Sequence, residues 1–170
     1  MPKKFLPHSC RAIALGLLTL IAFVAPSFGQ QKILGGYFEE WSIYYAGYNI
    51  ANLQQNGVAN KLSHLLYAFA NVTTTPAAGC AIADSWADYQ SPYLPSVNGQ
   101  PYPGPLYGNF AAIQQLKGLH PNLKVLMSIG GASSSNTQAF QIAASTAAGR
   151  QAMAASCIDL FINRNKAQGI

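Results

Sequence analysis

The stretch KVLMSIGG, at residues 124–131, decides the expected fold of this chain. It begins as a largely apolar run without the alternation of a half-exposed strand, which predicts a strand covered on both faces. The glycine pair predicts a sharp turn, and a helical pattern follows over Thr137–Ala167 with a break near residues 148–149. Residues 169–170 (GI) fit the closing glycine of that helix and the start of another strand, so we expect the sequence to stop just before that strand.

Two earlier stretches have the same character. Lys32–Phe38 (KILGGYF) and Leu62–Asn71 (LSHLLYAFAN) are both largely apolar, which again suits parallel strands. Helical patterns lie between the strands, over Ile50–Asn60 and over Phe110–Leu119. Strands that alternate with helices indicate βαβ units, so the sequence predicts an α/β fold with a parallel sheet.

Residues 1–29 have the architecture of a secretory signal peptide. A basic leader precedes an apolar run over Ala12–Val24, which is too short to span a membrane. Small residues at positions 27 and 29 then suit cleavage before Gln30. A membrane anchor or a buried helix is the alternative interpretation of this segment. We expect a secreted protein, extracellular or periplasmic, with no membrane attachment after cleavage.

Removal of residues 1–29 changes what the charge implies. The whole chain has ten Lys and Arg against five Asp and Glu, a formal net charge of +5. Three basic residues leave with the signal segment and all five acids stay, so seven against five gives a mature charge of about +2. The basicity belongs mostly to the targeting segment, and we expect no nucleic-acid partner.

The mature segment, residues 30–170, retains Cys80 and Cys157. An exported protein can form disulfides, but spacing alone does not decide whether these two cysteines pair, and the sequence leaves the question open. Neither a metal-ligand spacing nor a phosphate-binding or dinucleotide-binding fingerprint occurs in the sequence, so we expect no metal and no cofactor.

One connection between the expected elements is unusually long. Val72–Gly108 spans about 37 residues, contains six prolines and shows neither helical nor strand periodicity. Loops of this length are usually functional or disordered, and disordered segments are poor in aromatic residues. This loop has five, so we expect an ordered loop at the carboxyl ends of the strands, where α/β proteins bind ligands. Packing against the domain is the alternative role for each of them: Trp86, Tyr89, Tyr93, Tyr102 and Tyr107.

Four parts of the chain resemble, in order and spacing, the glycoside hydrolase family 18 chitinases of bacteria and fungi. GYFEEWSIY at residues 36–44 resembles their first strand and loop, and LSHLLYAFA at residues 62–70 is similar to their second strand. DSWAD at residues 84–88 and GNF at residues 108–110 resemble their long second loop. LKVLMSIGG at residues 123–131 resembles their third strand with its S-x-G-G signature.

The resemblance runs from Lys32 to Ile170 and implies a fold. Residues 30–170 would be the N-terminal part of a family 18 catalytic domain, truncated after the first three βα units of a (β/α)8 TIM barrel and before its fourth strand. Ala132 departs from the tryptophan that often follows S-x-G-G in this family. The complete enzyme is expected to be a monomer.

The resemblance also implies a reaction. Family 18 enzymes hydrolyse β-1,4-linked N-acetylglucosamine polymers with retention, and the substrate's own N-acetyl group acts as the nucleophile. Their general acid is the Glu of a D-x-x-D-x-D-x-E motif on the fourth strand, which we expect just after Ile170. The printed chain therefore has no expected catalytic residue, and residues 30–170 alone are expected to be inactive. The expected partner of the complete enzyme is chitin or an N-acetylglucosamine oligosaccharide.

Side chains at the strand ends supply the expected sugar contacts. A sugar ring has apolar C–H faces edged with hydroxyls, which flat aromatic rings with polar edges match. Two glycines after Ser128 let the backbone approach a ligand closely, although a tight turn alone would also use them. The expected substrate-binding residues are Tyr37, Trp41, Tyr44, Phe69, Trp86, Ser128, Gly130 and Gly131.

The sequence leaves two other functions open. A non-catalytic, lectin-like relative would keep the sugar-facing residues and bind chitin or another carbohydrate without cleaving it. A nonfunctional gene fragment is the third interpretation. The DNA immediately after codon 170 separates the three, because an in-frame acidic motif supports the enzyme, the same motif without its Glu supports the lectin, and a stop codon at a natural gene end supports the fragment.

Overall fold

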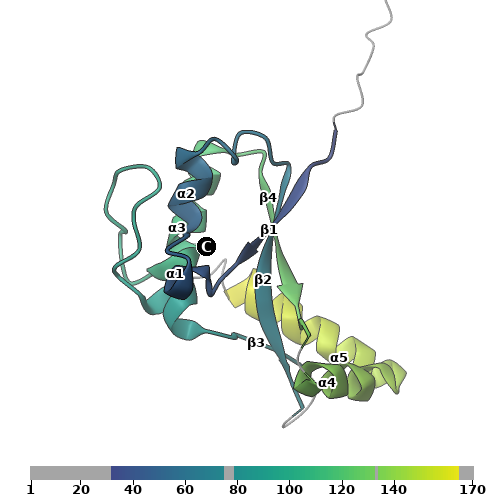
Figure 1. The fold of residues 1–170 in the computed structure, drawn as a ribbon. Helices are drawn as coiled ribbons and strands as arrows, with labels where there is room; N and C mark the ends of the chain where they lie inside the picture. Colours follow the sequence, from purple (N-terminus) through teal and green to yellow (C-terminus); the bar gives the residue numbers. More distant parts are fainter. Residues whose placement is uncertain (1–31, 75–78, 133, 165–170) are drawn as a thin grey trace, which may run out of the picture. The chain divides into compact units, whose positions relative to one another are not determined.

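Three parallel strands form the framework of the computed structural model (Figure 1). They are β1 (Gly35–Glu39), β2 (His64–Thr73) and β4 (Lys124–Ile129), and β2 lies between the other two. The prediction of three parallel strands is confirmed, with small shifts at their ends. The structure describes residues 32–74, 79–132 and 134–164, so the signal peptide predicted over residues 1–29 lies outside it. All the elements below belong to one unit, Ile33–Ile170.

The strand register assigns side chains to the two faces of the sheet. Phe38, Tyr67 and Met127 are neighbours in one row, and all three pack in or against the core that the helices cover. Side chains alternate along a strand, so Tyr37 and Leu126 belong to the opposite face. These two side chains are 65% and 46% exposed. The described helices therefore cover one face of the sheet and leave the other face open.

A helix packs beside the sheet before each of the two later parallel strands. Helix α2 (Ile50–Gln55) precedes β2, and α3 (Gly108–Leu119) precedes β4; Figure 1 shows them side by side along the strands. Asn49 begins α2, since its side-chain oxygen accepts a hydrogen bond from the Ala51 amide at 3.0 Å. Both predicted helices are confirmed, although α2 ends well before the expected Asn60. Their apolar side chains fill much of the core: Ile50, Leu53, Phe110, Ile113 and Leu116.

A short helix, α1 (Ser42–Tyr45), follows β1, and two longer helices and a turn follow β4. Up to residue 164, the pattern predicted over residues 137–167 forms α4 (Ser134–Ala144) and α5 (Ala147–Ile158), followed by the π-helical turn η2 (Asp159–Arg164). The predicted end of this pattern and the closing glycine lie outside the described residues. The break falls at residues 145–146, slightly before the predicted 148–149, because Thr146 caps α5: its side-chain oxygen accepts from the Gly149 amide at 2.9 Å. No helix in the described ranges has both the length and the apolar character needed to cross a membrane.

The long connection contains regular structure that its sequence did not predict. Strand β3 (Gly79–Ala81) pairs antiparallel with the end of β2, and the π-helical turn η1 (Trp86–Gln90) follows it. The prediction of a connection without strand structure was wrong because a strand of three residues is too short to show a period. A disulfide between Cys80 and Cys157 joins β3 to α5, with 4.9 Å between the Cα atoms. The two cysteines, whose pairing the sequence left open, are therefore bonded to each other.

Candidate functional site

Trp41, Phe69 and Gly131 meet at the carboxyl ends of the parallel strands. Trp41 follows β1, Phe69 lies in β2 just beyond the level where β1 ends, and Gly131 follows β4. The Trp41 and Phe69 rings are stacked, with centroids 5.6 Å apart and an interplanar angle of 25°. A Cβ at Gly131, whose φ is +90°, would lie 3.2 Å from the Phe69 ring, so glycine permits the close approach. Each strand thus contributes one residue to a continuous surface, which we name the aromatic surface.

A bulge in β2 accounts for the position of Phe69. The pairing of β2 with β4 shifts between Ala68 and Ala70, so Phe69 has no partner in the β2–β4 register. Bulges re-aim side chains and occur often beside functional sites. The irregularity therefore falls at the residue on which Trp41 stacks.

A second group of predicted residues gathers around Asp84. The Tyr44 hydroxyl donates a hydrogen bond to Asp84 Oδ2 at 2.6 Å, and Asp84 Oδ1 accepts from the Trp86 amide at 3.0 Å. The Trp86 ring lies 6.3 Å from that of Tyr93, and the two side chains are 45% and 81% exposed. Asp84 therefore fixes Tyr44 to the turn that presents Trp86.

The three remaining predicted residues lie elsewhere on the sheet. Tyr37 lies on the open face of the sheet. Ser128 pairs in register with Ala68, and Ala68 with Glu39, two residues along the strands from Tyr37 and therefore on the same face. Gly130 is buried against the Phe140 ring of α4, and its carbonyl accepts from the Asn136 side chain at 2.6 Å. Its observed contacts are those of a packing residue, so the structure gives Gly130 a different setting from Gly131.

Four buried polar side chains form a cluster that the sequence did not predict, which we name the carboxyl cluster: Glu40 after β1, Tyr67 of β2, Asp88 of η1 and Asn109 of α3. The Tyr67 hydroxyl donates to Asp88 Oδ1, and the Asn109 side-chain amide donates to the Tyr67 hydroxyl at 3.0 Å. That amide also donates to the Glu40 backbone carbonyl at 3.4 Å. One signal was available in the sequence, because a tyrosine inside an apolar strand needs a partner for its hydroxyl.

Burial controls the charge of the carboxyl cluster. Burial, reinforced by the charge of Asp88 and a hydrogen bond with it, raises the pKa of Glu40 to about 9. Burial also raises the pKa of Asp88 to about 6, while hydrogen bonds with Tyr67 and Glu40 oppose that rise. At neutral pH the proton therefore resides on Glu40 and the charge on Asp88. Both carboxyls are buried, so the cluster supports the site rather than meeting a ligand.

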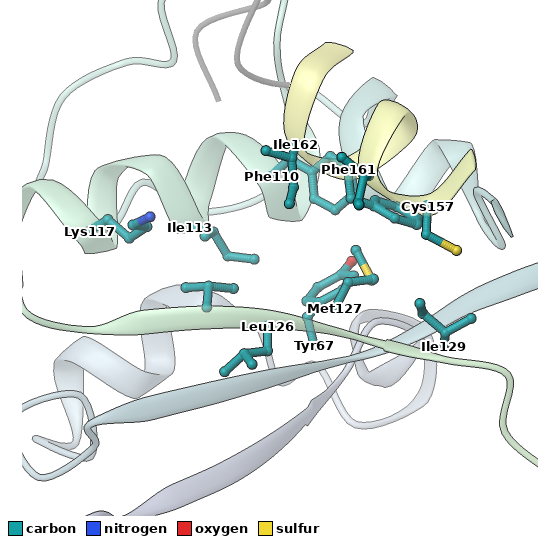
Figure 2. A pocket seen from close by; sticks show the side chains of 12 residues that line it. Tyr67, Phe110, Ile113, Lys117, Leu126, Met127, Ile129, Cys157, Phe161 and Ile162 are labelled. Atoms are coloured by element: carbon teal, nitrogen blue, oxygen red, sulfur yellow. The ribbon is translucent and has the colours of Figure 1, made fainter. Parts of the chain in front are cut away.

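An apolar cavity of about 420 Å³ lies on the helix-covered face of the sheet, between β4, α3 and the α5–η2 segment (Figure 2). Ile113, Met127 and Phe161 are among its lining side chains. None of the predicted substrate-binding residues lines it. The cavity is a gap in packing between sheet and helices, and the aromatic surface, rather than this cavity, is the candidate ligand site.

The fold and the site define an α/β domain with stacked aromatic side chains at its strand ends. The sequence pattern of the family described as "Glycosyl hydrolases family 18" matches residues 33–170. That range includes every strand and helix described above and every predicted site residue. The chain therefore belongs to glycosyl hydrolases family 18.

Chitinases are among the relatives of this chain. It is 42% identical to Chitinase C of Streptomyces lividans over 100 residues, which are 56% of this chain and 16% of the relative. It is 34% identical to Endochitinase 1 of Metarhizium robertsii over 152 residues, 86% of this chain and 33% of the relative. The catalytic domain of the psychrophilic chitinase B from Arthrobacter TAD20 has a similar structure, with a TM-score of 0.67 and 34% identity over 75% of this chain and 33% of that one. The chain thus spans a third or less of each of these proteins.

Proposed function

We propose that the protein carrying this chain is a secreted chitinase-type glycosidase. In this proposal, residues 30–170 supply the first three βα units of a (β/α)8 barrel, and an acidic motif beyond Ile170 supplies the general acid. The reaction is hydrolysis of β-1,4-linked N-acetylglucosamine polymers with retention, assisted by the substrate's N-acetyl group. Family membership and the chitinase relatives support the activity. The proposal includes cleavage before Gln30, no later membrane attachment and a monomeric enzyme.

The main structural support for this proposal is the stacking of side chains in the aromatic surface. The Trp41 ring stacks on Phe69, whose ring Gly131 approaches closely, and together they form a flat apolar area at the strand ends. Such an area matches the C–H face of a pyranose ring, while groups such as the Tyr44 hydroxyl suit the sugar's polar edge. Active sites of parallel α/β barrels form at this end of the strands. The geometry thus supports a sugar-binding role for residues 41, 69 and 131.

Catalysis needs a carboxylic acid that meets the substrate, and the carboxyl cluster does not offer one. Glu40 and Asp88 are 5% and 1% exposed. In the proposal their role is structural, and the chain of residues 30–170 has no turnover by itself. A lectin-like protein is the second candidate function, since the aromatic surface binds sugar whether or not an acid is present. An in-frame motif after codon 170 that lacks its Glu would favour that candidate.

Replacing Trp41 with alanine is expected to weaken binding of an N-acetylglucosamine oligosaccharide by about tenfold. Removal of a stacked apolar face of sugar size costs on the order of 1–2 kcal/mol, which corresponds to about one decade in Kd. Isothermal titration calorimetry with the protein expressed from its whole gene measures the change. Trp41→Phe is the matched control, because it keeps an aromatic face, and it is expected to retain most of the affinity. Unchanged affinity in a folded Trp41→Ala variant would show that Trp41 only packs.

A further inference from the structure

Glu40 lies at the point where the sheet ends and the aromatic surface begins. Its backbone amide donates to the Ala68 carbonyl at 2.8 Å, so it continues the pairing of β1 with β2. The next residue in the chain is Trp41, which stacks on Phe69, the neighbour of Ala68. The position of the Trp41 ring therefore depends on how Glu40 is held.

The side chain of Glu40 is held by η1. Both carboxyls are buried, and each raises or lowers the pKa of the other. The Asn109 amide connects them, because it donates to the Glu40 carbonyl and to the hydroxyl of Tyr67, which in turn donates to Asp88. The segment around Asp88 is itself fixed to the start of α3, because the Tyr107 amide donates to the Tyr89 carbonyl at 3.1 Å and the Gly108 amide to the Ser91 carbonyl at 3.0 Å. The contact between the two carboxyls thus connects the end of β1 to the long loop and to α3.

The surroundings of this contact do not suit two negative charges. The titratable groups that act on Glu40 are Asp88 of η1 and Asp84 before it, and Glu40 in turn acts on Tyr44 of α1 and Tyr67 of β2. Every one is acidic or phenolic, and no Lys, Arg or His of the described residues is among the groups that shift the pKa of either carboxyl. Glu40 Oε2 and Asn109 Oδ1 also have no hydrogen-bond partner among the described residues. A second charge here would be buried and uncompensated, which is strongly unfavourable.

We propose that Glu40 and Asp88 share one proton and together position Trp41 against Phe69, so that the aromatic surface keeps its geometry only while that proton is bound. Glu40 itself is buried, so its effect on a ligand would pass through the position of the Trp41 ring. Only the consequence for sugar binding rests on the proposed function, because the stacking of Trp41 on Phe69 is present without a ligand.

The proposal predicts a pH dependence of stability with a definite sign. Native Glu40 holds its proton up to a pKa of about 9, whereas the unfolded chain releases it near the ordinary value of 4.5. The native state therefore binds more protons between these values, and stability falls as pH rises. Above pH 6.5 this fall comes from Glu40, since the pKa of Asp88 is about 6. The folding equilibrium constant should drop by up to about tenfold per pH unit until pH 9.

Glu40→Gln is the variant that tests this prediction. The amide keeps the shape of the carboxyl but cannot ionise, so the fall in stability between pH 6.5 and 9 should disappear. Glu39→Gln is the matched control: the adjacent carboxyl is exposed and accepts from the Tyr45 hydroxyl at 2.8 Å, and its loss should leave the fall unchanged. Denaturant unfolding at a series of pH values, on the protein expressed from its whole gene, gives both slopes. A fall that persists in Glu40→Gln would overturn the proposal.

A second readout follows Trp41 itself. The difference in fluorescence between the protein and its Trp41→Phe variant isolates the Trp41 emission. Above pH 9 this emission should shift to longer wavelength as Trp41 leaves Phe69, and in the Glu40→Gln background it should stay constant.

Should Glu40→Gln fail to fold, Asp88→Asn takes its place, because loss of the Asp88 charge lowers the pKa of Glu40 and moves the shift to lower pH. An emission independent of pH would overturn the positioning role, and since no sugar is present, that result would leave the proposed function untouched.

Discussion

Replacing Cys80 and Cys157 together with serine is expected to lower the free energy of unfolding by about 4 kcal/mol. The disulfide closes a loop with a sequence separation of 77, and long loops lose the most chain entropy when they are cross-linked. The attachment of α5 depends strongly on this bond, because no residue of α5 or of η2 is buried in the described structure. A hydrogen bond of 3.1 Å from the Cys80 amide to Ser156 Oγ also joins β3 to α5.

Denaturant unfolding of the protein and its double-serine variant measures this loss. Reductant should bring the native protein to the stability of the variant and should leave the variant unchanged. Ser156→Ala is the control, since it removes the hydrogen bond but keeps the disulfide, and it should cost only about 1 kcal/mol. Equal unfolding midpoints for the protein and the double-serine variant would contradict the structural role of the bond.

Gly108→Ala is expected to destabilise the protein by about 3 kcal/mol or more. Gly108 has a φ of +64°, and a Cβ there would lie 2.6 Å from the Ala87 carbonyl oxygen and 2.7 Å from that of Asp88. These are backbone atoms of η1, so they cannot rotate away as a side chain would. The substitution therefore forces η1 from the start of α3 and disturbs the carboxyl cluster.

Gly99→Ala separates the clash from the cost of the backbone conformation. Gly99 also has a positive φ, +78°, but a Cβ there would meet nothing within 4 Å. Alanine at this position should cost only the conformational penalty of about 1–2 kcal/mol. Thermal or denaturant unfolding of both variants gives the difference. Equal losses for Gly108→Ala and Gly99→Ala would show that the contact with η1 is not tight.

The parallel strands and the helices between them could be predicted from the sequence because their signals are local. Apolar runs at residues 62–71 and 123–129 marked β2 and β4, and the pattern at residues 110–119 marked most of α3. Strand β3 could not be predicted in this way, since it exists through pairing with the end of β2 and a disulfide to α5. The S-x-G-G signature likewise could not show that Gly131 contacts Phe69 whereas Gly130 packs under α4.

Site residues at strand ends could likewise be predicted from the sequence, whereas those brought together only by folding could not. Trp41 and Phe69 were candidates because each lies at a strand end, and the structure brings them into contact. The roles of these residues in binding stay predictions. The carboxyl cluster was missed because its members come from four separate elements, and only folding places Glu40 beside Asp88. Asp88 lies in a loop without periodicity, so its burial had no signal in the sequence pattern.

In the proposed function, the aromatic surface belongs to an enzyme that cleaves β-1,4-linked N-acetylglucosamine polymers. Proton NMR of a chitin oligosaccharide incubated with the protein expressed from its whole gene tests this function, because the anomeric signals report cleavage and stereochemistry together. We predict shorter oligosaccharides whose new reducing ends appear first as the β anomer, as retention requires. An oligosaccharide that binds but stays intact would rule out the proposed cleavage, and new ends that appear first as the α anomer would rule out retention.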